Sequence, residues 1–330
     1  MVFDNIEFHN VEEMEKCEEG YLLWRLPANV RRSINEGART LTSSYGTGVE
    51  LRFKIKGDAV TIVLSAEDAA EANVAYIYYG SIQGGWQNSS KVILSEPTRI
   101  TIQKPENLSF LKDLSVKNNL SFSPEVVRVV LPYGRIHYWG VEGEVEVPCS
   151  RDIPKKTYLA YGSSITHGSL ALAMPYSYPF RIGQKLGCDY LNLGFAGSAQ
   201  MEKTMAEYIV SRKDWDFATV EMGINMVGEQ HSIEVFEKSV DEFTRVLATD
   251  FRPIFATSLY GFSDPKIMER GKEYRRIVER YAKDRLIFVD GLKLLDNAAY
   301  ISQDMVHPSL EGVESIVNNW CRIMYEKFNN

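Results

Sequence analysis

The sequence predicts an α/β protein in two parts, a β-sandwich followed by a parallel sheet with helices on both faces. Between about residues 51 and 147, short β-branched and aromatic runs recur at roughly ten-residue spacing, which is typical of a sandwich or jelly roll. After residue 157, short apolar runs alternate with segments of helical periodicity, as in successive β-α units. Because 330 residues exceed the usual size of one hydrophobic core, two domains are expected.

The composition is that of a water-soluble folded protein, with 45% apolar and 25% charged residues. The 44 acidic and 37 basic residues are mixed along both halves, so we expect no nucleic-acid partner. No run approaches the ~20 apolar residues of a membrane span, and the acidic N-terminus does not resemble a secretory signal. The four cysteines form no CxxC pair, which favours reduced thiols, no bound metal and a cytoplasmic location.

The first part is predicted to be a β-sandwich because its strand-like runs are separated by glycines and by Pro97. Residues 24–44 before them are expected to form a short helix or turn. Residues 148–157 (PCSRDIPKKT) contain two prolines and mixed charge, so they are the predicted linker between domains 1–150 and 151–330. The strand-like runs are LRFKIK, AVTIVLS, NVAYIYYG, KVILS, TRITI, VVRVVLP and GEVEVP.

The second part alternates strands and helices of the lengths found in parallel sheets. In such sheets the site lies beyond the carboxyl ends of the strands. The predicted strands are 157–162, 189–194, 216–223, 253–261 and 286–291, and the predicted helices are 178–187, 206–215, 235–250, 272–284 and 312–328.

Three short blocks follow strands in this second part, and each is ambiguous by itself. Residues 162–166 (GSSIT) place the Ser164 hydroxyl at a strand end, where a serine is also a common helix cap. Residues 192–198 (NLGFAGS) can present a backbone N–H to a substrate oxygen, or form a plain turn. Asn225, in the block GIN, can donate to a developing oxyanion or stabilise a local turn.

The fourth block, residues 304–308 (DMVHP), carries the strongest chemical signal. Asp304 lies three residues before His307, close enough to accept a hydrogen bond from Nδ1 and fix the tautomer of the ring. The chain has only five histidines, although a surface turn containing a histidine remains the alternative. An aspartate that orients a histidine, which in turn activates a serine, is the arrangement used in acyl transfer.

Taken together, the order Ser, Gly, Asn, His over residues 157–330 resembles the SGNH hydrolase superfamily, also called the GDSL esterases and lipases. The resemblance implies a flavodoxin-like three-layer α/β/α domain. It also implies that Ser164 is the nucleophile, His307 the general base and Asp304 its orienter. The oxyanion hole would consist of the N–H groups of Ser164 and Gly197 and the side chain of Asn225.

Two positions depart from the family pattern. Ser163 stands where the family usually has the Asp of GDS, as in relatives that have an N-terminal β domain, and Met226 stands where an Asp often follows the Asn. These departures bear on the branch of the superfamily that the chain resembles and on its substrate, and not on the chemistry of the triad. The elbow GxSxG and the nucleotide-binding patterns GxGxxG and GxxxxGK[ST] are absent, so we expect no cofactor.

Other residues have less specific patterns. We expect Ser163 and His167 to line the substrate pocket, with a helix-surface position as the alternative for His167. Aromatic residues in the β domain, among them Tyr78, Tyr79 and Trp86, could form a sugar-stacking platform, although alternating aromatics are more often core residues.

The predicted function is hydrolysis of a small acyl ester, with an acetyl group on a carbohydrate as the most specific hypothesis. The expected partner is a small-molecule or carbohydrate ester. We expect the protein to bind neither a membrane nor a nucleic acid. An acyltransferase that uses the same triad is the first alternative. An inactive carbohydrate-binding protein is the second. The sequence does not specify acyl length, leaving group or oligomeric state.

Overall fold

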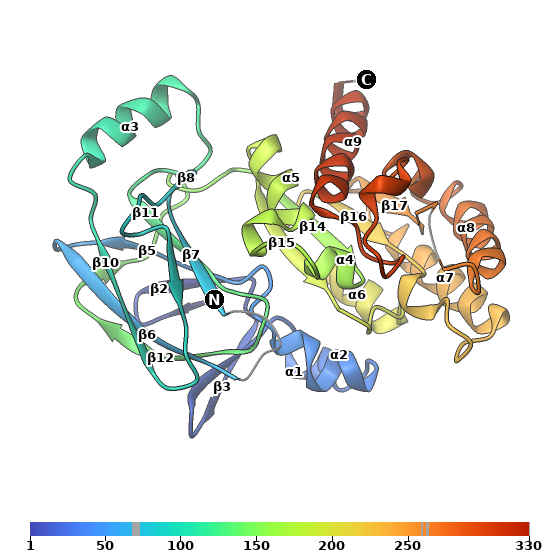
Figure 1. Cartoon of the computed structure of the whole chain (residues 1–330), viewed down its shortest axis with the longest axis horizontal. Coiled ribbons are helices and arrows are strands. Elements are labelled where there is room, and N and C mark those ends of the chain that lie inside the picture. Colours follow the sequence, from blue (N-terminus) through green and yellow to red (C-terminus); the bar gives the residue numbers. More distant parts are fainter. Residues whose placement is uncertain (68–72, 259, 262–263, 330) are drawn as a thin grey trace.

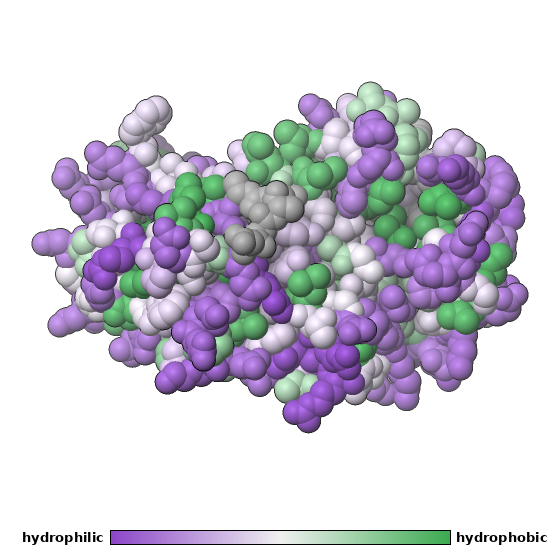
Figure 2. All heavy atoms as spheres, turned by 60° about the horizontal axis from the view of Figure 1, so that its bottom comes forward, coloured by the Kyte–Doolittle hydropathy of each residue, from purple (hydrophilic) through white to green (hydrophobic). Residues whose placement is uncertain are grey.

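A computed structural model describes residues 1–67, 73–258, 260–261 and 264–329, and it confirms the predicted fold class (Figure 1). Two antiparallel sheets form the first part, and a parallel sheet between helices forms the second. Figure 2 shows one face of the molecule, on which hydrophilic residues predominate and apolar residues form separate patches. Within these ranges no helix has the length and apolar content needed to cross a membrane.

The β-sandwich buries alternate residues of its strands between two sheets, as period-two side-chain geometry requires. Leu51 and Phe53 of one sheet and Ile62 and Leu64 of the other belong to the same core. The first sheet contains β1 (Val2–Phe3), β2 (Ile6–His9), β5 (Glu50–Ile55), β7 (Val74–Tyr79), β8 (Ile82–Gln83), β9 (Ser90–Val92), β11 (Val126–Val130) and β13 (Val145–Glu146). The second contains β3 (Glu13–Cys17), β4 (Gly20–Trp24), β6 (Ala59–Ala66), β10 (Thr98–Gln103) and β12 (Ile136–Glu142).

Several elements of the first part were not predicted. β1 to β4 extend the two sheets, but they are short, and charged residues in β3 obscure the apolar alternation. α3 (Leu108–Lys117) is a helix inserted between β10 and β11. The region expected to form a short helix or turn contains α1 (Ala28–Arg31), α2 (Glu36–Thr40) and η1 (Thr42–Ser44).

The parallel sheet has the order β15-β14-β16-β17-β18, which is the flavodoxin-like order. It places β15 at an edge and β14 between β15 and β16. Its strands are β14 (Thr157–Gly162), β15 (Asp189–Gly194), β16 (Phe217–Glu221), β17 (Ile254–Thr257) and β18 (Ile287–Val289). β17 is shorter than the strand predicted over 253–261, of which Leu259 lies outside the described residues.

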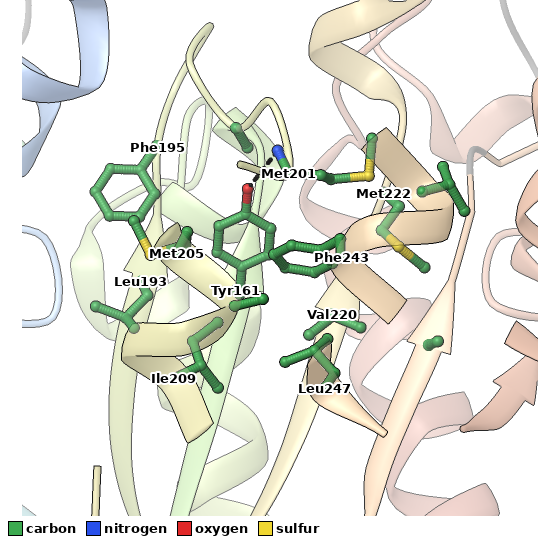
Figure 3. Packing of buried hydrophobic residues seen from close by; sticks show 14 of the residues in the cluster. Tyr161, Leu193, Phe195, Met201, Met205, Ile209, Val220, Met222, Phe243 and Leu247 are labelled. Atoms are coloured by element: carbon green, nitrogen blue, oxygen red, sulfur yellow. Dashed lines mark hydrogen bonds between the residues drawn. The ribbon is translucent and has the colours of Figure 1, made fainter. Parts of the chain in front are cut away.

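Helices cover both faces of this sheet because its strands are apolar on both sides. Tyr161 points to the face covered by α6 (Lys203–Ser211), α7 (Ile233–Leu247) and α8 (Met268–Ala282), and it packs against Phe195 and Phe243 (Figure 3). Its hydroxyl accepts a 3.0 Å bond from the N–H of Met201. Tyr158 faces α5 (Tyr178–Leu186) and α9 (Leu310–Asn329). The short elements are α4 (Ser164–His167), η2 (Met174–Tyr176), η3 (Ile224–Met226), η4 (Gly291–Lys293) and η5 (Ala298–Tyr300).

The predicted linker packs against the sandwich. Asp152 is buried, and its carboxylate lies 3.1 Å from the ammonium group of Lys54. The carbonyl of Asp152 accepts a bond from the N–H of Ser123. We propose that the domain boundary lies in this segment, between the end of β13 and the start of β14.

A buried charge network joins the two parts at the amino end of β15. The Arg52 guanidinium donates two 2.7 Å bonds to Asp189, and Glu50 lies between Arg52 and Arg128. Burial alone would raise the pKa of Glu50, but the charges of Arg128 and Arg52 lower it to about 2. Removing one member of such a group costs about 3–5 kcal/mol, because it leaves a buried charge unpaired.

Candidate active site

Ser164 lies at the carboxyl edge of the parallel sheet. β14 ends at Gly162, Ser163 caps the next helix by accepting a 3.2 Å bond from the N–H of Ile165, and α4 begins at Ser164. Gly168 ends this short helix in the left-handed conformation, with φ of 104°. The turn thus holds Ser164 with 8% of its surface exposed, at the edge where sites form in parallel sheets.

His307 connects Ser164 to Asp304. Its Nε2 lies 2.8 Å from Ser164 Oγ, and its Nδ1 lies 2.7 Å from Asp304 Oδ2. The surrounding loop is closed by a bridge between Ile301 and Pro308, and the contact of His307 with Ser164 joins this loop to the segment after β14. The structure therefore brings together all three residues predicted for the triad.

The environment of Asp304 favours its ionised form. Its Oδ1 accepts bonds from the hydroxyl of Ser302 at 2.7 Å and from the N–H groups of Val306 and His307 at 2.8 and 2.9 Å. Partial burial would raise the pKa of Asp304, but these hydrogen bonds and the one from the ring of His307 lower it well below its usual value. The Asp304 carboxylate is thus fixed in orientation and charged.

The three groups predicted for the oxyanion hole also lie at the carboxyl edge of the sheet. Ser164 is the first residue of α4, where an N–H group has no intrahelical partner. Gly197 has φ of 67° and follows β15, whereas Asn225 lies in η3 after β16. Asn225 Oδ1 accepts a 3.0 Å bond from the N–H of Ala199, which ties the two loops together. Within the described ranges, the Gly197 N–H and Asn225 Nδ2 donate to no protein acceptor.

Glu221 is a residue near the site that sequence reasoning missed. It ends β16, is 3% exposed, and accepts bonds from the N–H of Ser163 at 2.9 Å and its hydroxyl at 2.6 Å. A Cβ on Gly162 would overlap Thr166 Oγ1 and lie 2.7 Å from Glu221 Oε2, so a larger residue there would displace these hydrogen-bonded side chains. A carboxylate at the end of the apolar run FATVE was the available signal.

Residues 160–314 match the GDSL-like Lipase/Acylhydrolase family, and this segment contains the whole Ser164–His307–Asp304 arrangement. The chain carries a GDSL-like lipase/acylhydrolase domain. This match confirms the family resemblance described from the sequence. No curated protein matches the sequence significantly.

Solved structures share the fold of the chain, including the β-rich part before the GDSL-like domain. A salicylyl-acyltransferase from a tetracycline biosynthetic pathway matches with a TM-score of 0.75 at 15% identity, over 98% of this chain and 95% of its own. A GDSL-like lipase structure from Bacteroides ovatus ATCC 8483 matches with a TM-score of 0.69 at 16% identity, over 98% of both chains. A family two carbohydrate esterase from Clostridium thermocellum matches with a TM-score of 0.57 at 12% identity, over 85% of this chain and 92% of its own.

Ser163 and His167 of the GDSL-like domain lie elsewhere than expected. Both were expected to line the pocket, but their side chains are 1% and 0% exposed, respectively. Ser163 is held by Glu221, and His167 Nδ1 lies 2.9 Å from the carbonyl oxygen of Gly194. Both side chains are therefore buried in the protein, and His167 Nε2 has no hydrogen-bond partner among the described residues.

The aromatic residues of the sandwich do not form one platform. Tyr78 and Tyr79 are buried, and Tyr79 donates a 2.6 Å bond to the carbonyl of Gln103. Trp86 is fully exposed. Tyr78 and Tyr79 are therefore core residues.

A groove of about 780 Å³ lies beside the chain segments that follow Ser164 and His307 in the GDSL-like domain. Leu172 and Tyr176 come from the first segment, and Leu310 from the second. Leu172 also lines a smaller pocket of about 290 Å³, together with Tyr76 and Tyr133 of the sandwich. Residues from both parts of the chain thus line this smaller pocket, which shares Leu172 with the groove.

Glu221→Gln is expected to change the pH dependence of stability. Burial raises the pKa of Glu221, although the hydrogen bonds from Ser163 and Thr166 partly offset this effect. As pH rises above 4.5, the unfolded chain loses this proton before the folded chain, so the wild type loses stability until pH exceeds the folded-state pKa.

The glutamine variant lacks this titration and can still accept bonds from Ser163. Its free energy of unfolding should therefore rise relative to the wild type across that interval, by up to about 1.4 kcal/mol per pH unit. Urea unfolding of both proteins at several pH values between 4 and 8 measures the difference. A difference that stays constant with pH would contradict the raised pKa.

Proposed function

We propose that this protein is a serine esterase that hydrolyses a small acyl ester, with Ser164 as nucleophile and His307 as general base. Asp304 orients His307. The observation that carries the proposal is the continuous hydrogen-bonded path from Ser164 Oγ through His307 to Asp304, with distances of 2.8 and 2.7 Å. Both distances lie within the range needed for proton transfer and for orientation of the base.

In the first half-reaction, His307 Nε2 takes the proton of Ser164 while Oγ bonds to the ester carbonyl carbon. The oxyanion that forms accepts hydrogen bonds from the N–H groups of Ser164 and Gly197 and from Asn225 Nδ2. His307 then gives its proton to the alcohol oxygen as the ester C–O bond breaks. In the second half, His307 deprotonates water, which attacks the acyl-enzyme. The acid leaves, and Ser164 recovers a proton.

The substrate we favour is an acetyl ester of a carbohydrate. The carbohydrate esterase from Clostridium thermocellum shares this fold, and the groove beside the segments that follow Ser164 and His307 is lined by both apolar and polar side chains. Acyl transfer to an alcohol is the second candidate, favoured by the fold shared with a salicylyl-acyltransferase over 98% of this chain. The hydrogen-bonded path through His307 argues against an inactive binding protein.

The test uses p-nitrophenyl acetate, a fluorophosphonate probe and a panel of acetylated sugars. We expect a burst of nitrophenol, mass-spectrometric labelling of Ser164 and release of acetate from at least one sugar. Ester product in place of free acid, on addition of an acceptor alcohol, would instead identify a transferase. Absence of both turnover and labelling would overturn the proposal.

Asn225→Ala is expected to lower kcat about 10²- to 10³-fold, because it removes one oxyanion donor. Asn225→Asp is the matched variant, since it retains the acceptor for the N–H of Ala199 but has no amide donor. Steady-state kinetics on p-nitrophenyl acetate measure both. If Asn225→Asp kept the wild-type rate, the donor role would be wrong.

A further inference from the structure

The free edge of β15 is covered by side chains of the N-terminal sandwich. β15 pairs with β14 on one side only, so its alternate carbonyls on the other side need donors. His9 Nε2 lies 2.5 Å from the carbonyl of Tyr190, and Asn10 Nδ2 donates a 2.9 Å bond to that of Asn192. Arg25 donates to the carbonyls of Asn192 at 2.8 Å and Gly194 at 2.9 Å. Side chains thus replace a neighbouring strand.

Arg25 differs from the other buried arginines of this interface in its partners. It is 0% exposed and donates to the carbonyls of Asn192, Gly194 and Thr42. No carboxylate among the described residues forms a salt bridge with it, whereas Arg52 contacts Asp189 and Glu50. Burial lowers the pKa of Arg25 to about 9, so it is still a cation at neutral pH. A buried cation without a counter-ion is costly, which calls for a role beyond packing.

The contacts of Arg25 lead to one backbone donor of the oxyanion hole through Phe195. Gly194 ends β15, and Gly197 follows it by three residues. The guanidinium carbon of Arg25 lies 5.0 Å from the centre of the Phe195 ring, which is anchored in the core of the α/β part (Figure 3). Arg25 therefore holds both the end of the strand and the first residue of the loop that carries Gly197.

The same contacts lead to the second donor through His167. The carbonyl of Gly194 accepts from Arg25 and from His167 Nδ1, which must carry the hydrogen because a carbonyl only accepts. His167 is the last residue of α4, whose first residue is Ser164. Burial and the nearby charge of Arg25 lower the pKa of His167 well below its usual value, so the ring is neutral. One carbonyl thus links Arg25 to both α4 and the Gly197 loop.

We propose that Arg25 is a positioning residue, through which the N-terminal sandwich fixes the relative placement of the two backbone donors, Ser164 N–H and Gly197 N–H. The inference rests on the proposed esterase function. The planar guanidinium of Arg25 can hold two carbonyls of one strand edge at once, which the ammonium group of a lysine cannot do. Because transition-state stabilisation depends on donor placement, a displacement of about 1 Å costs about 10²-fold in rate.

The experiment compares Arg25→Gln and Arg25→Lys with Asp189→Asn in the full-length protein. Asp189 is the first residue of β15, so Asp189→Asn weakens the same interface at the end of the strand remote from Ser164. We expect Arg25→Gln to lower kcat about 10²-fold with KM nearly unchanged, and Arg25→Lys to give an intermediate rate. Asp189→Asn should lower the melting temperature but keep the wild-type kcat.

The rate of inactivation by a fluorophosphonate provides a second measurement, because its tetrahedral adduct also uses the oxyanion donors. It should fall in both Arg25 variants and stay unchanged in Asp189→Asn. Wild-type kcat in the Arg25 variants, or an equal loss in all three variants, would overturn the positioning role while leaving the esterase intact. If Arg25→Gln does not fold, Arg25→Lys decides by the same criteria. An unreactive wild type would overturn the esterase and this inference together.

Discussion

Ser164→Ala is expected to lower kcat for p-nitrophenyl acetate on the order of 10⁶-fold, because no other group replaces the attacking oxygen. The residual rate would come from substrate binding and the oxyanion donors alone. Stopped-flow measurement of nitrophenol release should show no burst, and the fluorophosphonate probe should no longer label the protein.

Ser163→Ala is the matched control, because it removes the neighbouring hydroxyl from the same turn. It loses the helix cap and the bond to Glu221, which is expected to cost about 1 kcal/mol of stability. It should still be labelled at Ser164. Labelling that survived in Ser164→Ala but disappeared in Ser163→Ala would show that the nucleophile is Ser163 and not Ser164.

Asp304→Asn is expected to lower kcat about 10⁴-fold while the fold stays intact. The amide of the variant can donate to Nδ1, which would leave His307 in the tautomer that cannot accept the Ser164 proton. Steady-state kinetics together with circular dichroism measure the rate and the fold.

The pH dependence provides a separate check on Asp304. The pKa of Asp304 is lowered, so its carboxylate is still ionised at pH 3.8, the usual pKa of an aspartate. The ability of Asp304 to orient His307 is lost only at lower pH.

Ser302→Ala removes one of the hydrogen bonds to Asp304 and should lower the rate much less than Asp304→Asn. Equal losses in the two variants would show that loop order, rather than the carboxylate, limits the rate.

The sequence was sufficient to predict that Ser164, His307 and Asp304 lie together, because local patterns identify all three residues. Asp304 and His307 are three residues apart, and the turn between them alone brings the carboxylate to Nδ1. The parallel sheet places Ser164, Gly197 and Asn225 at the same edge, since each of these three residues follows a strand of that sheet.

Glu221 and Arg25 could not be predicted in this way. The partners of Glu221 lie on a different strand end, 58 residues away in the case of Ser163. Arg25 is separated from Gly194 by 169 residues, and its burial results from the packing of the sandwich against β15. Of the strands between residues 2 and 24 that were missed, β2 and β4 pair with the distant strands β5 and β12, and β1 and β3 pair only with β2 and β4.

The side chains that cover the edge of β15 limit how this protein can change in evolution. Without the sandwich, the carbonyls of Tyr190, Asn192 and Gly194 would be open to pairing with strands of other molecules. Removing the sandwich, or replacing it with another domain, would therefore expose this edge of β15. Under the positioning role proposed for Arg25, substitutions that remove its contacts with this edge are expected to reduce both solubility and catalytic rate.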